Sequence, residues 1–168
     1  MRAERHASSG SKLPWRQLAI GAICLVLIGG FLFTRYGNER EDYMTNAEIA
    51  GVQHLYTIAP RGSLLMTAWD GAPWEAVNYE QYDEEVLYEV IPDAVSNRNV
   101  NAILQFVKGS GAKESYLLIS RTQRATAELG GYQPGLLDRL ARDLQRSGKF
   151  TLIFSNTDAQ IYKYNPGK

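Results

Sequence analysis

Residues 17–34 form the longest apolar run of the chain, and their sequence, QLAIGAICLVLIGGFLFT, contains no charged side chain. An α-helix rises about 1.5 Å per residue, so this run crosses most of a hydrocarbon layer about 30 Å thick. The pattern predicts one transmembrane helix at 17–34. The sequence after it mixes apolar, polar and charged residues, as a globular domain does.

Three helices are predicted in the second part of the chain from apolar positions three and four residues apart. The first spans 45–57 and begins with Thr45-Asn46-Ala47-Glu48, which fits a capping box. The second spans 97–109. The third follows Gly130-Gly131, with Pro134 in its first turn and Gly148 as a left-handed cap at its end.

Five short apolar runs predict strands at 63–69, 85–91, 115–120, 150–155 and 159–164. The runs SLLMTAW and SYLLIS are almost unbroken, which is typical of strands that are covered on both faces. Asn156-Thr157-Asp158 has turn chemistry and makes the last two strands a β-hairpin. Strands that alternate with amphipathic helices predict an α/β fold, a small three-layer αβα sandwich with a mostly parallel sheet and an antiparallel edge.

Charged residues beside the apolar run predict its orientation. Arg2, Arg5, Lys12 and Arg16 precede it, whereas Arg35 and Arg40 follow it closely, and the more basic flank stays in the cytoplasm. The alternative is a cleaved secretory signal. The run is longer than such signals usually have, and it ends in FLFTR without a small-residue cleavage site. We therefore expect an uncleaved anchor in the cell membrane, with the C-terminal domain outside the cytoplasm.

The predicted organisation has four parts: a basic, disordered cytoplasmic tail at 1–16, the span at 17–34, a linker at 35–44 and an extracytoplasmic domain at 45–168. Four of the 18 basic and one of the 18 acidic residues precede the span, which leaves 14 basic and 17 acidic residues after it. This balance excludes a basic surface for nucleic acid. The single cysteine, Cys24, lies within the span, so the domain has no disulfide.

Three segments carry a resemblance to a known family: RYGNE after the span, LYTIAPRGSLLMTAW, and the stretch from ESYLLISRTQ to NTDAQIYKY. They resemble the C-terminal extracytoplasmic domain of large polytopic membrane glycosyltransferases of actinobacteria. Those enzymes use a lipid-linked sugar, and their catalytic carboxylate lies between early transmembrane helices. This chain has one span and no position that matches that motif. The resemblance therefore implies an accessory domain, alone or separated from a longer protein.

The first candidate ligand-binding segment leaves the strand at 115–120. Open α/β sheets bind ligands beyond the carboxyl ends of their strands, and two arginines, a hydroxyl and an amide there suit a phosphate or a polyol. The alternative is that the same residues cap the strand and a following short helix. The segment consists of Ser120, Arg121, Thr122, Gln123 and Arg124.

The long connection after the first strand is the second candidate. Trp69, Asp70 and Trp74, with Tyr79, Tyr82 and Asp83, combine aromatic rings and carboxylates, which suit a sugar ring. The alternative is that the rings cover the core with their polar ends in water. The acidic run that includes Glu80, Glu84 and Glu85 is interpreted as a solvated face.

No cofactor and no metal are predicted. His54 has no second histidine at ligand spacing, and Gly109-Ser110-Gly111 follows a helix instead of preceding one, as a phosphate loop would. Two functions remain open. One is a non-catalytic envelope module that binds a polytopic glycosyltransferase or an envelope glycan. The other is a small glycan- or phosphate-active enzyme that uses Arg121 with an acid such as Asp70 or Asp83.

Overall fold

The computed structural model describes residues 15–36, 43–72 and 79–167. The chain divides into two compact units, Met1–Glu39 and Arg40–Lys168. In the first unit the described part is helix α1 (Trp15–Tyr36), which encloses the predicted span. Within the described ranges, α1 is the one helix long and apolar enough to cross a membrane. The predicted tail up to residue 14 and most of the linker lie outside the described residues.

The second unit is built on a mixed five-stranded sheet. Its strands are β1 (Leu64–Thr67), β2 (Asp83–Val86), β3 (Ser115–Ser120), β4 (Phe150–Ser155) and β5 (Ala159–Tyr164), in the order β2-β1-β3-β5-β4. The strands β2, β1 and β3 are parallel, and the β4–β5 hairpin joins β3 antiparallel. The predicted α/β class and the C-terminal hairpin are confirmed.

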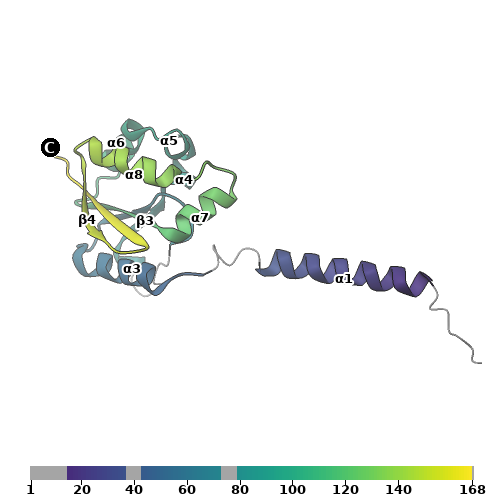
Figure 1. The fold of residues 1–168 in the computed structure, drawn as a ribbon. Helices are drawn as coiled ribbons and strands as arrows, with labels where there is room; N and C mark the ends of the chain where they lie inside the picture. Colours follow the sequence, from purple (N-terminus) through teal and green to yellow (C-terminus); the bar gives the residue numbers. More distant parts are fainter. Residues whose placement is uncertain (1–14, 37–42, 73–78, 168) are drawn as a thin grey trace, which may run out of the picture. The chain divides into compact units, whose positions relative to one another are not determined.

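Helices cover both faces of this sheet, which confirms the three-layer arrangement (Figure 1). Helix α3 (Asn46–Ile58) covers one face. The other face carries α4 (Leu87–Val90), α5 (Pro92–Ser96), α6 (Val100–Gly109) and α8 (Leu136–Arg146), and α7 (Arg121–Leu129) follows β3 directly. A short 3₁₀-helix, η1 (Tyr79–Gln81), precedes β2.

Strand β3 runs through the middle of the core, and all six of its residues are buried. Leu117 and Ile119 face α6 and α8, whereas Tyr116 and Leu118 face α3. Because both faces are covered, the strand has no polar side to alternate with its apolar side. The unbroken run SYLLIS is explained by this double burial.

The predicted capping box is present at the start of α3. The Thr45 hydroxyl accepts a hydrogen bond from the Glu48 N–H group (3.1 Å), and the Glu48 carboxylate accepts one from the Thr45 N–H group (3.0 Å). At the end of α8, Gly148 has φ 71°. This is the left-handed conformation that was predicted there, and it favours glycine.

The predicted strand at 85–91 is wrong from Leu87 on, and the observed strand begins earlier, at Asp83. Strand β2 ends at Val86, and the chain continues as helix α4. Its neighbour β1 ends at the same level, because the Gln123 side-chain oxygen accepts hydrogen bonds from the next two backbone N–H groups, those of Ala68 (3.1 Å) and Trp69 (3.3 Å). Beyond Val86 the chain therefore has no strand partner.

Besides α4, helices α5 and α7 were not among the three predicted helices, although the structural alternative for the segment at 120–124 included a short helix after β3, and two predicted starts differ. Pro92 begins α5 instead of only ending a strand, and α6 starts at Val100 with Asn99 as its cap. Helix α7 has no leucine stripe that would reveal it in the sequence, because its buried positions are Thr122, Gln123 and alanines. Pro134 lies just before the N-cap of α8, which is Gly135, and not in the first turn.

Candidate functional site

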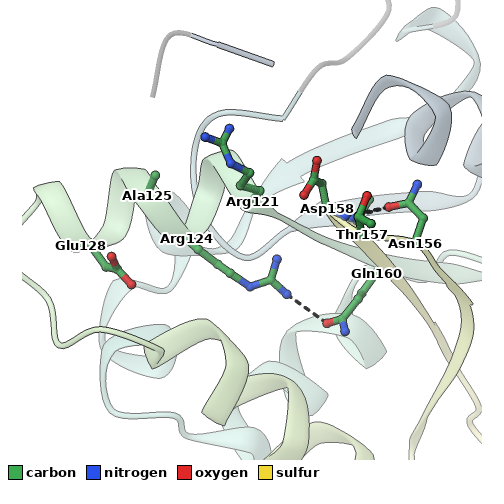
Figure 2. Close-up of a pocket in the computed structure, with 9 residues that line it drawn as sticks. Arg121, Arg124, Ala125, Glu128, Asn156, Thr157, Asp158 and Gln160 are labelled. Carbon is green, nitrogen blue, oxygen red and sulfur yellow. Dashed lines mark hydrogen bonds between the residues drawn. The ribbon is translucent and has the colours of Figure 1, made fainter. Parts of the chain in front are cut away.

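A cleft of about 290 Å³ lies between helix α7 and the turn that joins β4 to β5. Figure 2 shows that one wall comes from α7 and the other from the hairpin. Its polar lining consists of Arg121, Arg124 and Glu128 from α7, and Asn156, Thr157, Asp158 and Gln160 from the hairpin. The cleft thus lies at the carboxyl end of β3, where the sequence predicted a site.

Local hydrogen bonds fix both walls of the cleft. The Asn156 side-chain oxygen accepts hydrogen bonds from the Asp158 (3.0 Å) and Ala159 (2.8 Å) N–H groups and so shapes the turn. The Asn156 amide donates to the Ala47 carbonyl of α3 (2.7 Å). The Arg121 N–H group donates to the Asp158 carbonyl (2.7 Å), which joins the start of α7 to the turn.

Arg124 is held in place from two sides. Its Nε donates to Asp138 Oδ1 (2.7 Å), and its Nη2 donates to Gln160 Oε1 (3.1 Å). The same Gln160 oxygen accepts a hydrogen bond from the Tyr162 hydroxyl (2.9 Å). Burial raises the pKa of Tyr162, so this hydroxyl keeps its proton at neutral pH. These contacts leave Arg124 one orientation along the cleft wall (Figure 2).

Arg121 is held much less. Its described side-chain contact is one hydrogen bond from Nη1 to the Tyr43 carbonyl, at 3.4 Å. A guanidinium has five N–H donors in a fixed plane. Most donors of Arg121, which lines the cleft, therefore have no partner among the described residues.

The other three residues of the predicted segment are buried and hold the fold together. Ser120 caps α7 by accepting from the Gln123 N–H group (3.4 Å). Thr122 donates from its backbone N–H group (2.7 Å) and its hydroxyl (3.0 Å) to the carboxylate of Glu48. Gln123 binds the end of β1, as described above. Ser120, Thr122 and Gln123 therefore have the structural roles that the alternative interpretation gave them. Of the five residues of this segment, only Arg121 and Arg124 line the cleft.

The aromatic side chains described in the second candidate segment have packing roles: Trp69 lies in the core and Tyr82 packs against it. Trp69 is 4% exposed and stacks on Tyr88, with ring centroids 3.6 Å apart. The Tyr82 hydroxyl donates to the carbonyls of Tyr56 and Ala59, each at 3.3 Å. Trp74 and the side chain of Tyr79 lie outside the described residues. Sugar stacking on Trp69 would require this ring to leave the core, and the half-buried Tyr82 ring is already stacked on Tyr56.

Neither acid suggested as a partner of Arg121 lines the cleft. The register pairs Leu64 with both Asp83 and Ser115, so Asp83 is level with the opposite end of β3. At about 3.3 Å per residue, that end is roughly 16 Å from Ser120. Asp70 accepts a hydrogen bond from the Gly71 N–H group (2.8 Å), and Gly71 lies against the Thr122 side of α7. A reaction that pairs Arg121 with Asp83 is excluded by this geometry.

The sequence did not indicate that Glu128 and the hairpin turn belong to the site. Asn156-Thr157-Asp158 was interpreted as a turn only. Its place beside Arg121 depends on β5 lying next to β3, which no local pattern encodes. The sequence held one indirect indication: if the last strand paired antiparallel with β3, its first residues would lie beside the end of β3, and the hairpin turn with them.

Within residues 15–36, 43–72 and 79–167, no group of three or more His, Cys, Asp or Glu residues is arranged to hold a metal ion. His54 stacks on Phe154 with ring centroids 4.4 Å apart, so it has a packing role on α3. The chemistry of the cleft is that of hydrogen bonding by arginine, amide and carboxylate groups.

Comparison with known proteins provides no assignment: no protein-family model matches the chain, and no curated protein or solved structure matches it.

Proposed function

We propose that this protein is a single-pass membrane protein whose α/β domain lies outside the cytoplasm and assists cell-envelope glycan assembly as a binding module. Four basic residues lie beside the apolar run 17–34 on its N-terminal side and two, Arg35 and Arg40, lie close to its C-terminal side, which favours a cytoplasmic N-terminus. The likeness to the C-terminal domain of actinobacterial polytopic glycosyltransferases supports glycan assembly as the process. The module would bind such an enzyme, or the glycan itself, without transferring sugar.

The observation that carries this proposal is the combination of α1 with a preformed polar cleft in a separate α/β unit. The cleft acids hold structural contacts. Asp158 accepts a hydrogen bond from the Thr45 hydroxyl (2.7 Å), and Glu128 accepts one from the Gly135 N–H group (3.4 Å). Catalytic transfer needs an acid and a base placed around one reacting bond. Because the acids of this cleft are engaged in structural contacts, its polar groups suit the binding of a ligand better than the transfer of a sugar.

The topology is testable with two reporters fused after Lys168. Alkaline phosphatase, which is active only outside the cytoplasm, should be active in this fusion, and green fluorescent protein, which folds only inside, should be dark. Changing Arg2, Arg5, Lys12 and Arg16 to glutamine should lower the phosphatase activity, because the basic flank that keeps the N-terminus inside is removed. A bright fluorescent fusion of the unchanged protein would contradict the proposed orientation.

The partner is testable by crosslinking in intact membranes. The full-length protein, carrying a photoreactive residue at Thr157, should crosslink to a polytopic membrane glycosyltransferase or to glycan. A photoreactive residue at Glu89, which is exposed on α4 away from the cleft, is the matched control. Recovery of cytoplasmic proteins alone would count against the proposal.

A further inference from the structure

We infer that the cleft between α7 and the β4–β5 turn binds one neutral sugar unit through its hydroxyl groups, with Arg121 as the principal donor. This inference rests on the proposed function, because it names the class of ligand that the module holds. It does not depend on which enzyme is the partner.

The charge of the lining selects against simple ions. The cleft contains two arginines, Arg121 and Arg124, and two carboxylates, Glu128 and Asp158. A phosphate or a cation in the cleft would therefore meet lining groups of its own sign as well as of the opposite sign. A sugar hydroxyl donates one hydrogen bond and accepts others, so a ring with neighbouring hydroxyls suits both kinds of group.

Hydrogen-bonding groups of both kinds remain available among the described residues. Arg121 has the single 3.4 Å contact described above, and the Thr157 hydroxyl has no described partner. Asp158 uses Oδ2 to accept from Thr45, and its Oδ1 has no described hydrogen-bond partner. Arg124 is already oriented by Asp138 and Gln160, so binding would not have to order it.

The size of the cleft limits the ligand. Pockets for small molecules usually measure about 300–1,000 Å³, and this cleft of about 290 Å³ is at the lower end. It is open to solvent on one side, so a glycan chain can extend out of it while one ring is held. A single ring of a longer envelope glycan is therefore the ligand that the volume admits.

The test uses the full-length protein in detergent micelles and saturation-transfer difference NMR, which detects weakly bound small molecules. The probes are the methyl glycosides of glucose, galactose, mannose and arabinose, with inorganic phosphate as the anionic comparison. At least one glycoside should bind with a millimolar dissociation constant and should not be displaced by phosphate. Displacement of bound glycoside by phosphate, or binding of no glycoside, would overturn the inference.

Two variants tie binding to the cleft. Arg121→Met keeps the length of the side chain but removes the donors, and it should weaken glycoside binding about tenfold or more, as expected for charged hydrogen bonds. Arg142→Met, on an exposed position of α8, is the matched control and should leave binding unchanged. Should Arg121→Met not fold, Asp158→Asn replaces it, since an amide still accepts from Thr45. Unchanged affinity in the folded cleft variant would overturn the inference.

Failure of this inference can be told apart from failure of the proposed function. If no glycoside binds but the photoreactive protein still crosslinks to a glycosyltransferase, the sugar site is wrong and the accessory role stands. If glycosides bind but the reporters place the domain in the cytoplasm, the envelope function is wrong.

Discussion

Replacing Glu48 by alanine is expected to lower the free energy of unfolding of the α/β domain by about 3–5 kcal/mol, because several hydrogen-bond donors lose their acceptor and each buried donor left unsatisfied costs about 1–3 kcal/mol. The Glu48 side chain is completely buried. It accepts hydrogen bonds from the Thr45 N–H group, the Thr122 N–H group and the Thr122 hydroxyl. Alanine leaves these buried donors without an acceptor.

Glu48 joins the starts of two helices that are far apart in the sequence. Thr45 is the N-cap of α3, and Thr122 lies in the first turn of α7. The first N–H groups of a helix have no partner within the helix, and the helix dipole favours a negative charge there. One carboxylate therefore stabilises both helix starts, and α7 carries one wall of the cleft.

The same residue predicts a dependence on pH. Burial raises the pKa of Glu48, but the hydrogen bonds from Thr45, Thr122 and Ser120 outweigh burial, so the pKa lies below its usual value. A carboxyl group whose pKa is lowered by folding stabilises the fold above its unfolded pKa, about 4.3 for glutamate. This contribution is lost as the pH falls through the lower pKa of the folded state.

The measurement is chemical unfolding of the full-length protein in micelles, followed by near-ultraviolet circular dichroism. Glu48→Gln, which keeps the shape but not the charge, should be about 2–3 kcal/mol less stable than the unchanged protein at pH 7. This difference should shrink below pH 4.3. Glu89→Ala, at an exposed position, is the control and should change stability by less than about 0.5 kcal/mol. Equal stability of Glu48→Gln and the unchanged protein at pH 7 would contradict the network.

Replacing Gly51 by valine is expected to destabilise the domain by about 3 kcal/mol, at the upper end of what overpacking usually costs. Gly51 is buried on α3 where this helix crosses β5. A Cβ atom at Gly51 would lie 2.7 Å from the Cβ atom of Ala159. That neighbour is fixed to the backbone of a central strand and cannot turn away, so the helix itself would have to move.

Alanine variants make the test sharper. Gly51→Ala gains about 1 kcal/mol of helix propensity but meets the same contact, so we expect a net loss of stability. Gly109→Ala, at a helical glycine with no atom within 4 Å of the added Cβ, should keep the gain. Adding Ala159→Gly to Gly51→Ala should recover part of the loss, which a double-mutant cycle measures. Equal stability changes at positions 51 and 109 would show that α3 and β5 do not pack this closely.

The elements that the sequence predicted well are those with a local pattern. The capping residues Thr45 and Glu48, the leucine stripe of α8 and the apolar runs of β3 and β5 are recorded in neighbouring residues, because helix and strand periodicities act over a few positions. The elements that it missed depend on distant partners. Helix α7 is buried through Thr122 and Gln123, whose contacts are Glu48 and the end of β1.

The residues of the candidate site also fall into two groups: those that a local pattern indicated and those that only the tertiary structure brought together. The sequence indicated Arg121 and Arg124 because they follow a buried strand, but three neighbours and Trp69 proved to have packing or capping roles. The hairpin residues Asp158 and Gln160 joined the cleft only through the pairing of β3 with β5.

The sequence by itself determined the apolar span, the α/β class and the hairpin, because hydrophobic burial over short stretches of chain dictates each of them. Only the tertiary structure decided which polar groups share the cleft. A hydrogen bond such as that between Arg124 and Gln160 joins residues brought together by the sheet order, and no local pattern records which strands are neighbours.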